Sequence, residues 1–107
     1  KKHNTINKFD LNGLDDLICE LKEANLPVYF TVDLDVLDPS VFPGTGTPEP
    51  GGISYKKLQD AVIKVCGGLN IIAADVVELC PHYDQSGAST AIACKILREL
   101  LLALSGR

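Results

Sequence analysis

Apolar positions recur along the chain at two different spacings, and these predict alternating helices and strands. Between positions 14 and 21, three leucines and one isoleucine stand three or four residues apart, which indicates an amphipathic helix. Asn25 and Pro27 should end this helix. Residues 28–34 are apolar at nearly every position, as in a strand that is covered on both faces.

The second half of the chain repeats this order. Ser54 is a candidate N-cap for a helix that Gly67 and Gly68 should end. Residues 69–77 predict a second buried strand, and residues 87–104 predict a long final helix that is apolar nearly all round. Such a helix must be covered on more than one side. Its exposed stripe is expected at Lys95, Arg98, Glu99 and Leu102.

The order helix, strand, helix, strand, helix predicts an α/β fold with a parallel sheet and a right-handed crossover. Two strands do not form a stable open sheet alone. We therefore expect residues 1–107 to be a single partial domain of a longer protein that supplies the other strands. The alternative is that the chain oligomerises through its sheet. The lack of any methionine, including at position 1, favours the longer protein.

Composition narrows the class of protein. A length of 107 residues allows one domain, and a net charge of −4 argues against a nucleic-acid partner or attraction to an anionic membrane. No apolar run is long enough to span a bilayer, and we expect no signal peptide, because no apolar stretch follows the first residues. The cysteines are widely spaced and expected to be small buried hydrophobes, which disfavours a zinc site and favours a reduced, cytoplasmic protein. They are Cys19, Cys66, Cys80 and Cys94.

Four acidic residues end the two predicted strands. Asp33 and Asp35 stand two residues apart, so on a strand their side chains would share one face about 6.5 Å apart and could bind one or two metal ions. Asp75 and Glu78 follow at the second strand, and parallel strands end at the same edge of a sheet. Such a cluster implies a cation, either magnesium, manganese or calcium or a cationic substrate. Alternatively, Asp75 or Glu78 caps a turn or pairs with a lysine.

The loop at residues 43–52 combines three prolines with four glycines. It lacks the Gly-Lys-Ser/Thr of a phosphate-binding loop. A rigid loop that buries little apolar surface favours a binding role, and the hydroxyls of Thr45 and Thr47 could hydrogen-bond a polar ligand. His82 could also contact a ligand, although a surface position is commoner, and His3 is expected to be exposed.

Three segments together resemble successive signatures of the ureohydrolases, the binuclear manganese enzymes that include arginase and agmatinase. They are Val32-Asp-Leu-Asp-Val-Leu-Asp-Pro39, Gly44-Thr-Gly-Thr-Pro-Glu-Pro-Gly-Gly52 and Ala74-Asp-Val-Val-Glu-Leu-Cys-Pro-His-Tyr-Asp84. The resemblance covers about residues 28–104. The Pro-Glu-Pro-Gly-Gly motif is more similar to the agmatinase branch of the family than to arginase. It implies that the chain is the C-terminal part of a three-layer α/β/α, arginase-like parallel-sheet fold.

The resemblance also implies a reaction, in which a guanidinium compound is hydrolysed to urea and an amine. Agmatine is the first candidate substrate, and the reaction would belong to polyamine biosynthesis. By position, Asp33 and Asp35 would be two of six manganese ligands. Glu78 would pair with the substrate guanidinium, with Thr47 beside it, and Asp75 would help to shape the site. We expect the full-length enzyme to form a homo-oligomer, although Lys56 and Lys57 depart from the family pattern and put inherited subunit contacts in doubt.

The remaining ligands of that family lie in Gly-Gly-Asp-His and Asp-Ala-His-x-Asp motifs, and neither motif occurs here. The histidine thought to shuttle protons belongs to the same absent half, so no catalytic residue is expected in this chain. With two ligands of six, manganese should bind weakly. We therefore expect the isolated chain to be inactive.

Other functions remain open at this point. The parent enzyme could be an arginase or a guanidinobutyrase rather than an agmatinase, or the chain could be a non-catalytic α/β fragment. Asp-Leu-Asp after an apolar strand also resembles the haloacid-dehalogenase phosphatases. Those enzymes continue Asp-x-Asp-Gly-Thr, whereas Val36-Leu-Asp-Pro39 follows here, which disfavours a phosphatase.

Overall fold

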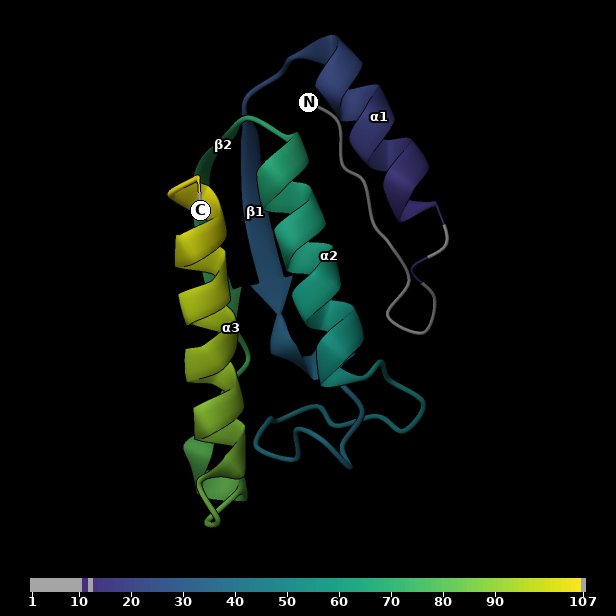
Figure 1. Ribbon diagram of the computed structural model, residues 1–107. Coiled ribbons are helices and arrows are strands. Elements are labelled where there is room, and N and C mark those ends of the chain that lie inside the picture. The colour runs from purple at the N-terminus through teal and green to yellow at the C-terminus, as the bar shows by residue number, and fades with distance from the viewer. Residues whose placement is uncertain (1–10, 12, 107) are drawn as a thin grey trace.

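The computed structural model describes Leu11 and residues 13–106, so His3 lies outside the described residues. The observed order of helices and strands confirms the predicted order (Figure 1). Short 3-10 turns, η1 (Leu34–Val36) and η2 (Pro81–Tyr83), follow the two strands. The longer elements are α1 (Leu14–Ala24), β1 (Val28–Asp33), α2 (Tyr55–Gly68), β2 (Ile71–Val77) and α3 (Ala88–Leu104).

Local chemistry ends the helices where the sequence predicts. Asn25 adopts the left-handed conformation with φ of 49°, and its N–H donates to the carbonyls of Leu21 and Lys22 at 3.1 Å each. Ser54 is the N-cap of α2, because its Oγ accepts a hydrogen bond from the N–H of Lys57 at 3.2 Å. No helix among residues 11 and 13–106 is long and apolar enough to cross a membrane.

The two strands pair in parallel, as predicted, with Thr31 opposite Asp75 and Asp33 opposite Val77. Helices α2 and α3 pack side by side over one face of this sheet (Figure 1). The core between them contains Val32 from β1, Val62 from α2 and Ile96 from α3. Since β1 and β2 end at the same end of the molecule, the loops that follow them lie close together.

Two predictions about coverage are not met by this chain alone. Exposure alternates along β1, so only one face of the strand is covered by the described residues, and Tyr29 on the other face is 61% exposed. Helix α3 is likewise covered mainly on the side toward α2, which leaves Leu97 45% and Leu101 59% exposed. Apolar surface left open in this way is typical of an interface with further structure.

The predicted exposed stripe of α3 is also partly wrong. Lys95 and Arg98 are exposed and Leu102 is half-buried, but Glu99 is only 6% exposed. It lies on the side of α3 that packs against α2. Burial, with the nearby charge of Glu99 as a second cause, raises the pKa of Tyr55 on α2. A charged residue in an apolar helix is therefore not a reliable marker of its solvent side.

Phe42 anchors the loop after β1 in the core and is 0% exposed. We expect Phe42→Ala to lower the free energy of unfolding by about 3–5 kcal/mol, because it leaves a cavity in a packed core. Chemical denaturation followed by circular dichroism checks this. Tyr83→Ala is the control, since Tyr83 is 65% exposed and should cost less than about 0.5 kcal/mol. An equal loss for both variants would contradict the placement of Phe42.

Candidate functional site

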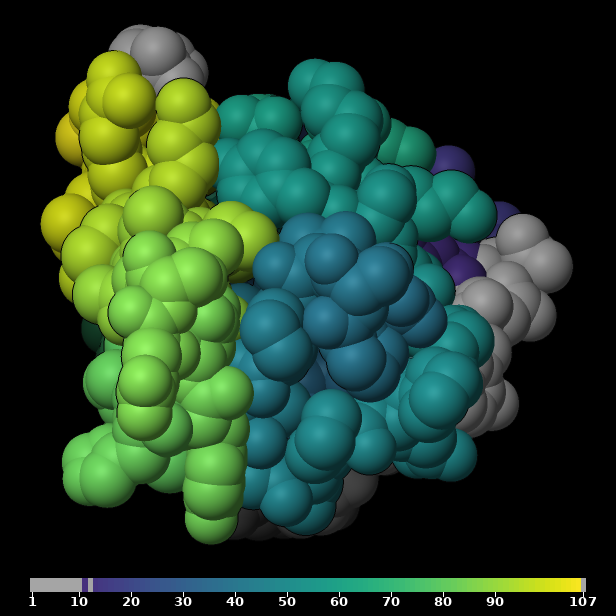
Figure 2. All heavy atoms as spheres, turned by 90° about the horizontal axis from the view of Figure 1, so that it is seen from below, coloured from purple at the N-terminus to yellow at the C-terminus, as the bar shows by residue number. Residues whose placement is uncertain are grey.

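The candidate site lies at the carboxyl ends of the strands. Figure 2 views this end of the molecule, where the loop after β1 (blue to teal) lies directly beside the segment that leads into α3 (green). The N–H of Cys80 donates a hydrogen bond of 2.7 Å to the carbonyl of Gly44 across this boundary. The two loops that carry the predicted site residues are therefore in contact.

Asp33 and Asp35 are held together by a tight turn rather than by an extended strand. Strand β1 ends at Asp33, and Asp35 belongs to the 3-10 turn η1. The Oδ1 of Asp33 accepts a hydrogen bond of 3.1 Å from the N–H of Asp35. The prediction that both side chains project from one face of a strand is wrong, because the chain turns directly after Asp33, but the turn keeps the two residues adjacent.

Thr47 contacts this pair directly. Its Oγ1 donates a hydrogen bond of 2.7 Å to the Oδ2 of Asp35, twelve residues earlier. Thr45, the other hydroxyl proposed for ligand binding, is 2% exposed, and its Oγ1 has no hydrogen-bond partner among the described residues. Thr47 is thus the hydroxyl of this loop that reaches the acidic pair at the surface.

Glu78 follows β2 and brings a third negative charge to the pair. It adopts the left-handed conformation with φ of 78°, which is uncommon for a residue with a side chain. Partial burial raises the pKa of Asp33, and the nearby charges of Asp35 and Glu78 raise it further. Asp33, Asp35 and Glu78 therefore repel one another electrostatically, and a bound cation would relieve this repulsion.

Asp75 does not join these three acids. Its Oδ2 accepts a hydrogen bond of 2.6 Å from the hydroxyl of Tyr29, an interaction that raises the pKa of Tyr29. Its Oδ1 is buried without a partner among the described residues. The prediction that all four acids gather at one edge is therefore wrong for Asp75, which lies two residues before the end of β2.

Asp38 closes the base of the loop, a role that the sequence analysis missed. Its Oδ1 accepts hydrogen bonds from the N–H groups of Gly51 at 2.8 Å and Gly52 at 3.3 Å. Its Oδ2 accepts from the N–H and hydroxyl of Ser40. A Cβ at Gly52 would lie 2.5 Å from the N of Asp38, so only glycine allows the two ends of the loop to approach this closely.

These hydrogen bonds lower the pKa of Asp38 from its ordinary 3.8 to about 2. Because the folded state holds the carboxylate charged, Asp38 stabilises the fold above about pH 4, and this contribution is lost as the pH falls toward 2. We expect Asp38→Asn to lower the thermal unfolding midpoint at pH 7 and to change it little near pH 2. Thermal unfolding at both pH values checks this, with Asp60→Asn on the surface of α2 as the control. An equal effect of Asp38→Asn at both pH values would contradict the role.

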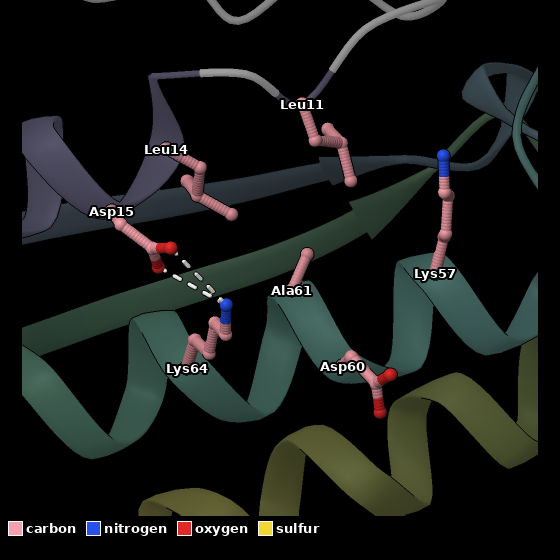
Figure 3. A pocket seen from close by; sticks show the side chains of 7 residues that line it. All are labelled: Leu11, Leu14, Asp15, Lys57, Asp60, Ala61 and Lys64. Carbon is pink, nitrogen blue, oxygen red and sulfur yellow. Dashed lines mark hydrogen bonds and ion pairs between the residues drawn. The ribbon is translucent and has the colours of Figure 1, made fainter.

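A separate shallow pocket lies between α1 and α2 (Figure 3). Its wall includes the ion pair of Lys64 Nζ with the Oδ1 of Asp15 at 3.1 Å. Lys57 and Asp60 line it as well, so its charges balance. This pocket shares no residue with the acidic site and offers no excess negative charge for a cationic ligand.

The chain matches the sequence profile of the arginase family over residues 2–103. The chain belongs to the arginase family. It is 45% identical over 97 residues to an agmatinase of Bacillus cereus, which covers 89% of this chain and 33% of that protein. The chain thus spans about a third of the length of the curated relatives that it matches.

Solved structures of the family show the same arrangement. The agmatine ureohydrolase of Thermoplasma volcanium aligns with a TM-score of 0.75 and 31% identity, covering 94% of this chain and 34% of that one. An arginase from Bacillus caldovelox aligns with a TM-score of 0.74 and 33% identity, covering 81% and 29%. The prediction of an arginase-like α/β fold is thereby confirmed.

The donor set of this arginase-family chain fits part of a metal site. Asp33 and Asp35 offer adjacent carboxylates, which hard divalent cations such as manganese accept. Among the described residues, however, no three His, Cys, Asp or Glu side chains come close enough to hold an ion. His82 is exposed in η2. Asp33 and Asp35 could therefore hold a metal only together with ligands from elsewhere.

Proposed function

We propose that the parent enzyme hydrolyses a guanidinium compound to urea and an amine. By parent enzyme we mean the longer protein of which we expect this arginase-family chain to be the C-terminal part. Agmatine is the first candidate substrate, because relatives over 40% identical are named agmatinases. One observation supports the proposal above all others. The turn that joins Asp33 and Asp35 also receives the hydroxyl of Thr47 at 2.7 Å and the electrostatic influence of Glu78.

Two of the acidic residues are metal ligands in this proposal. Asp33 and Asp35 are two manganese ligands in a binuclear site that the rest of the parent enzyme completes. Bound manganese supplies a nucleophile at neutral pH, because it lowers the pKa of coordinated water. Thr47 fixes the side chain of Asp35 by its hydrogen bond. A ligand held in one orientation loses less entropy when the metal binds.

Glu78 recognises the substrate. A carboxylate accepts charge-assisted hydrogen bonds from the N–H groups of a guanidinium, and the planar geometry of the two groups allows two such bonds. The left-handed backbone conformation of Glu78 turns the chain away from the direction of β2 directly after the strand ends. Its charge also stabilises the substrate while the guanidinium carbon is attacked.

The isolated chain should be inactive, since two carboxylates are too few to hold two metal ions. No group of three side chains that could hold a metal ion occurs in residues 11 and 13–106. The proton-shuttling histidine that the family resemblance implies has no counterpart in the motifs of this chain. We therefore assign the reaction to the parent enzyme. We propose separately that this enzyme is a soluble homo-oligomer in the cytoplasm.

Urea release by the parent enzyme tests the proposal. The purified enzyme is loaded with manganese and assayed separately with agmatine, arginine and guanidinobutyrate. We expect agmatine to give the highest kcat/KM. Preference for one of the other two would identify an arginase or a guanidinobutyrase, and no urea from any of the three would contradict a ureohydrolase. The phosphatase alternative would be supported instead if the enzyme released phosphate from a phosphomonoester and Asp33→Asn abolished this release.

A further inference from the structure

We propose that Ser89 is a positioning residue that sets the distance between the two substrate-facing loops. The first, the Thr47 loop, comprises residues 43–52, and the second, the Glu78 loop, comprises residues 78–87. This inference rests on the proposed function and concerns how the same site holds its guanidinium substrate.

Ser89 lies in the first turn of α3 and is 0% exposed. Its Oγ accepts a hydrogen bond of 2.9 Å from the N–H of Gly44 in the Thr47 loop. The same hydroxyl donates a bond of 2.6 Å to the Oδ2 of Asp84 in the Glu78 loop. One buried hydroxyl therefore bridges the two loops.

Asp84 and Gly44 are shaped to receive this hydroxyl. The Oδ2 of Asp84 also accepts from the N–H of Ser89 at 2.8 Å, and hydrogen bonds from serines hold the pKa of Asp84 at about 2, so the acceptor is charged at neutral pH. A Cβ at Gly44 would lie 2.6 Å from the Cβ of Ser89. Only glycine allows the loop to approach α3 this closely.

The carbonyl of Gly44 completes the junction, because it accepts from the N–H of Cys80 at 2.7 Å. Gly44 stands three residues before Thr47, and Cys80 stands two residues after Glu78. The junction at Gly44 and Ser89 thus fixes how far Glu78 lies from the turn that carries Asp35. A guanidinium held between them requires this distance to be correct to about 1 Å, since a misplacement of that size can cost about 100-fold in rate.

Substitution of Ser89 in the parent enzyme tests the inference. We expect Ser89→Ala to lower kcat/KM for agmatine by about 10- to 100-fold, while the affinity for manganese falls by much less, because Asp33 and Asp35 lie outside the junction and are linked to it indirectly, through the hydrogen bond of Thr47. Ser86→Ala is a matched control. Ser86 Oγ also donates to Asp84, at 2.5 Å, but among the described residues it makes no hydrogen bond to Gly44, so this variant should keep kcat/KM within about 3-fold of the wild type.

Two further measurements separate positioning from a general structural role. In a Glu78→Gln background, Ser89→Ala should cost less than about 3-fold, since the contact that it positions is already weakened. Hydrogen exchange of the amides at residues 44–47 should accelerate in Ser89→Ala and not in Ser86→Ala. Gly44→Ala, which displaces the loop by steric contact, repeats both measurements if Ser89→Ala fails to fold.

The inference fails if Ser89→Ala matches Ser86→Ala in kcat/KM and in exchange. It fails equally if the loss is the same with and without Glu78, or if manganese affinity falls in parallel with activity. A wild-type parent enzyme that releases no urea would refute the proposed function instead. In that case the exchange measurement still decides whether Ser89 fixes the Thr47 loop.

Discussion

Asp33→Ala in the parent enzyme is expected to reduce urea release from agmatine by more than about 100-fold. Loss of a partner that only supports a metal ligand typically costs about 10- to 100-fold in metal affinity or activity, and loss of the ligand itself should cost more. The Asp33 carboxylate also accepts a hydrogen bond of 3.1 Å from the N–H of Asp35. Removal of this carboxylate therefore loosens the second ligand of the same turn. Steady-state kinetics at saturating manganese, with metal content measured in parallel, check this result.

Asp16→Ala provides the control for this experiment, because Asp16 is exposed on α1 and belongs to none of the site loops. It should leave urea release and manganese content unchanged. Asp33→Ala should also fold, since the side chain is exposed, and circular dichroism confirms that point. A folded Asp33→Ala enzyme with undiminished activity would remove Asp33 from the metal site.

Glu78→Gln is expected to lower kcat/KM for agmatine by about 100-fold or more. The substitution keeps the size of the side chain but removes the charge that pairs with the guanidinium, and breaking such a pair costs about 2–5 kcal/mol. Because that pairing holds the bound substrate and strengthens in the transition state, KM should rise and kcat should fall. Kinetics over a wide range of agmatine concentration separate the two effects.

Manganese binding distinguishes Glu78 from the metal ligands. Glu78→Gln should retain the wild-type metal content, whereas Asp33→Ala should not. Glu23→Gln on the exposed side of α1 is the matched control and should leave kcat/KM within about 2-fold of the wild type. If Glu78→Gln lost metal while KM for agmatine stayed unchanged, Glu78 would be a ligand rather than the substrate acceptor.

The fold could be predicted from the sequence because its signals are local. The helical spacing of apolar residues between positions 14 and 21, the serine at position 54 and the apolar run of residues 28–34 each act within one element. Parallel pairing followed from the alternation of strands and helices. The element bounds differ from the prediction by one or two residues at the strand ends, where Leu34 enters η1 and Ile71 begins β2.

Coverage of those elements could not be predicted, because it depends on what packs against them. The apolar run of residues 28–34 resembles a strand buried on both faces, yet Tyr29 is 61% exposed in this chain. Glu99 resembles a solvent-facing residue and is 6% exposed. In both cases the sequence specifies a side chain, while neighbouring elements decide whether water reaches it.

The proximity of Asp33, Asp35 and Glu78 was predictable, since their positions follow from strand ends. The supporting contacts were not. Asp38 binds Gly51 thirteen residues away, and Ser89 binds Gly44 at a separation of 45 residues. Hydrogen bonds between distant loops depend on tertiary packing, so the residues that position this site became visible only in the structure.

Manganese titration tests the central claim most directly, namely that this chain supplies two carboxylate ligands of a larger metal site. The parent enzyme, its Asp33→Ala/Asp35→Ala double variant and the isolated chain are titrated with manganese by calorimetry under the same conditions. We predict two ions per subunit for the parent enzyme, loss of metal binding in the double variant, and no micromolar binding by the isolated chain. Micromolar binding by the isolated chain, or two ions retained by the double variant, would contradict the account.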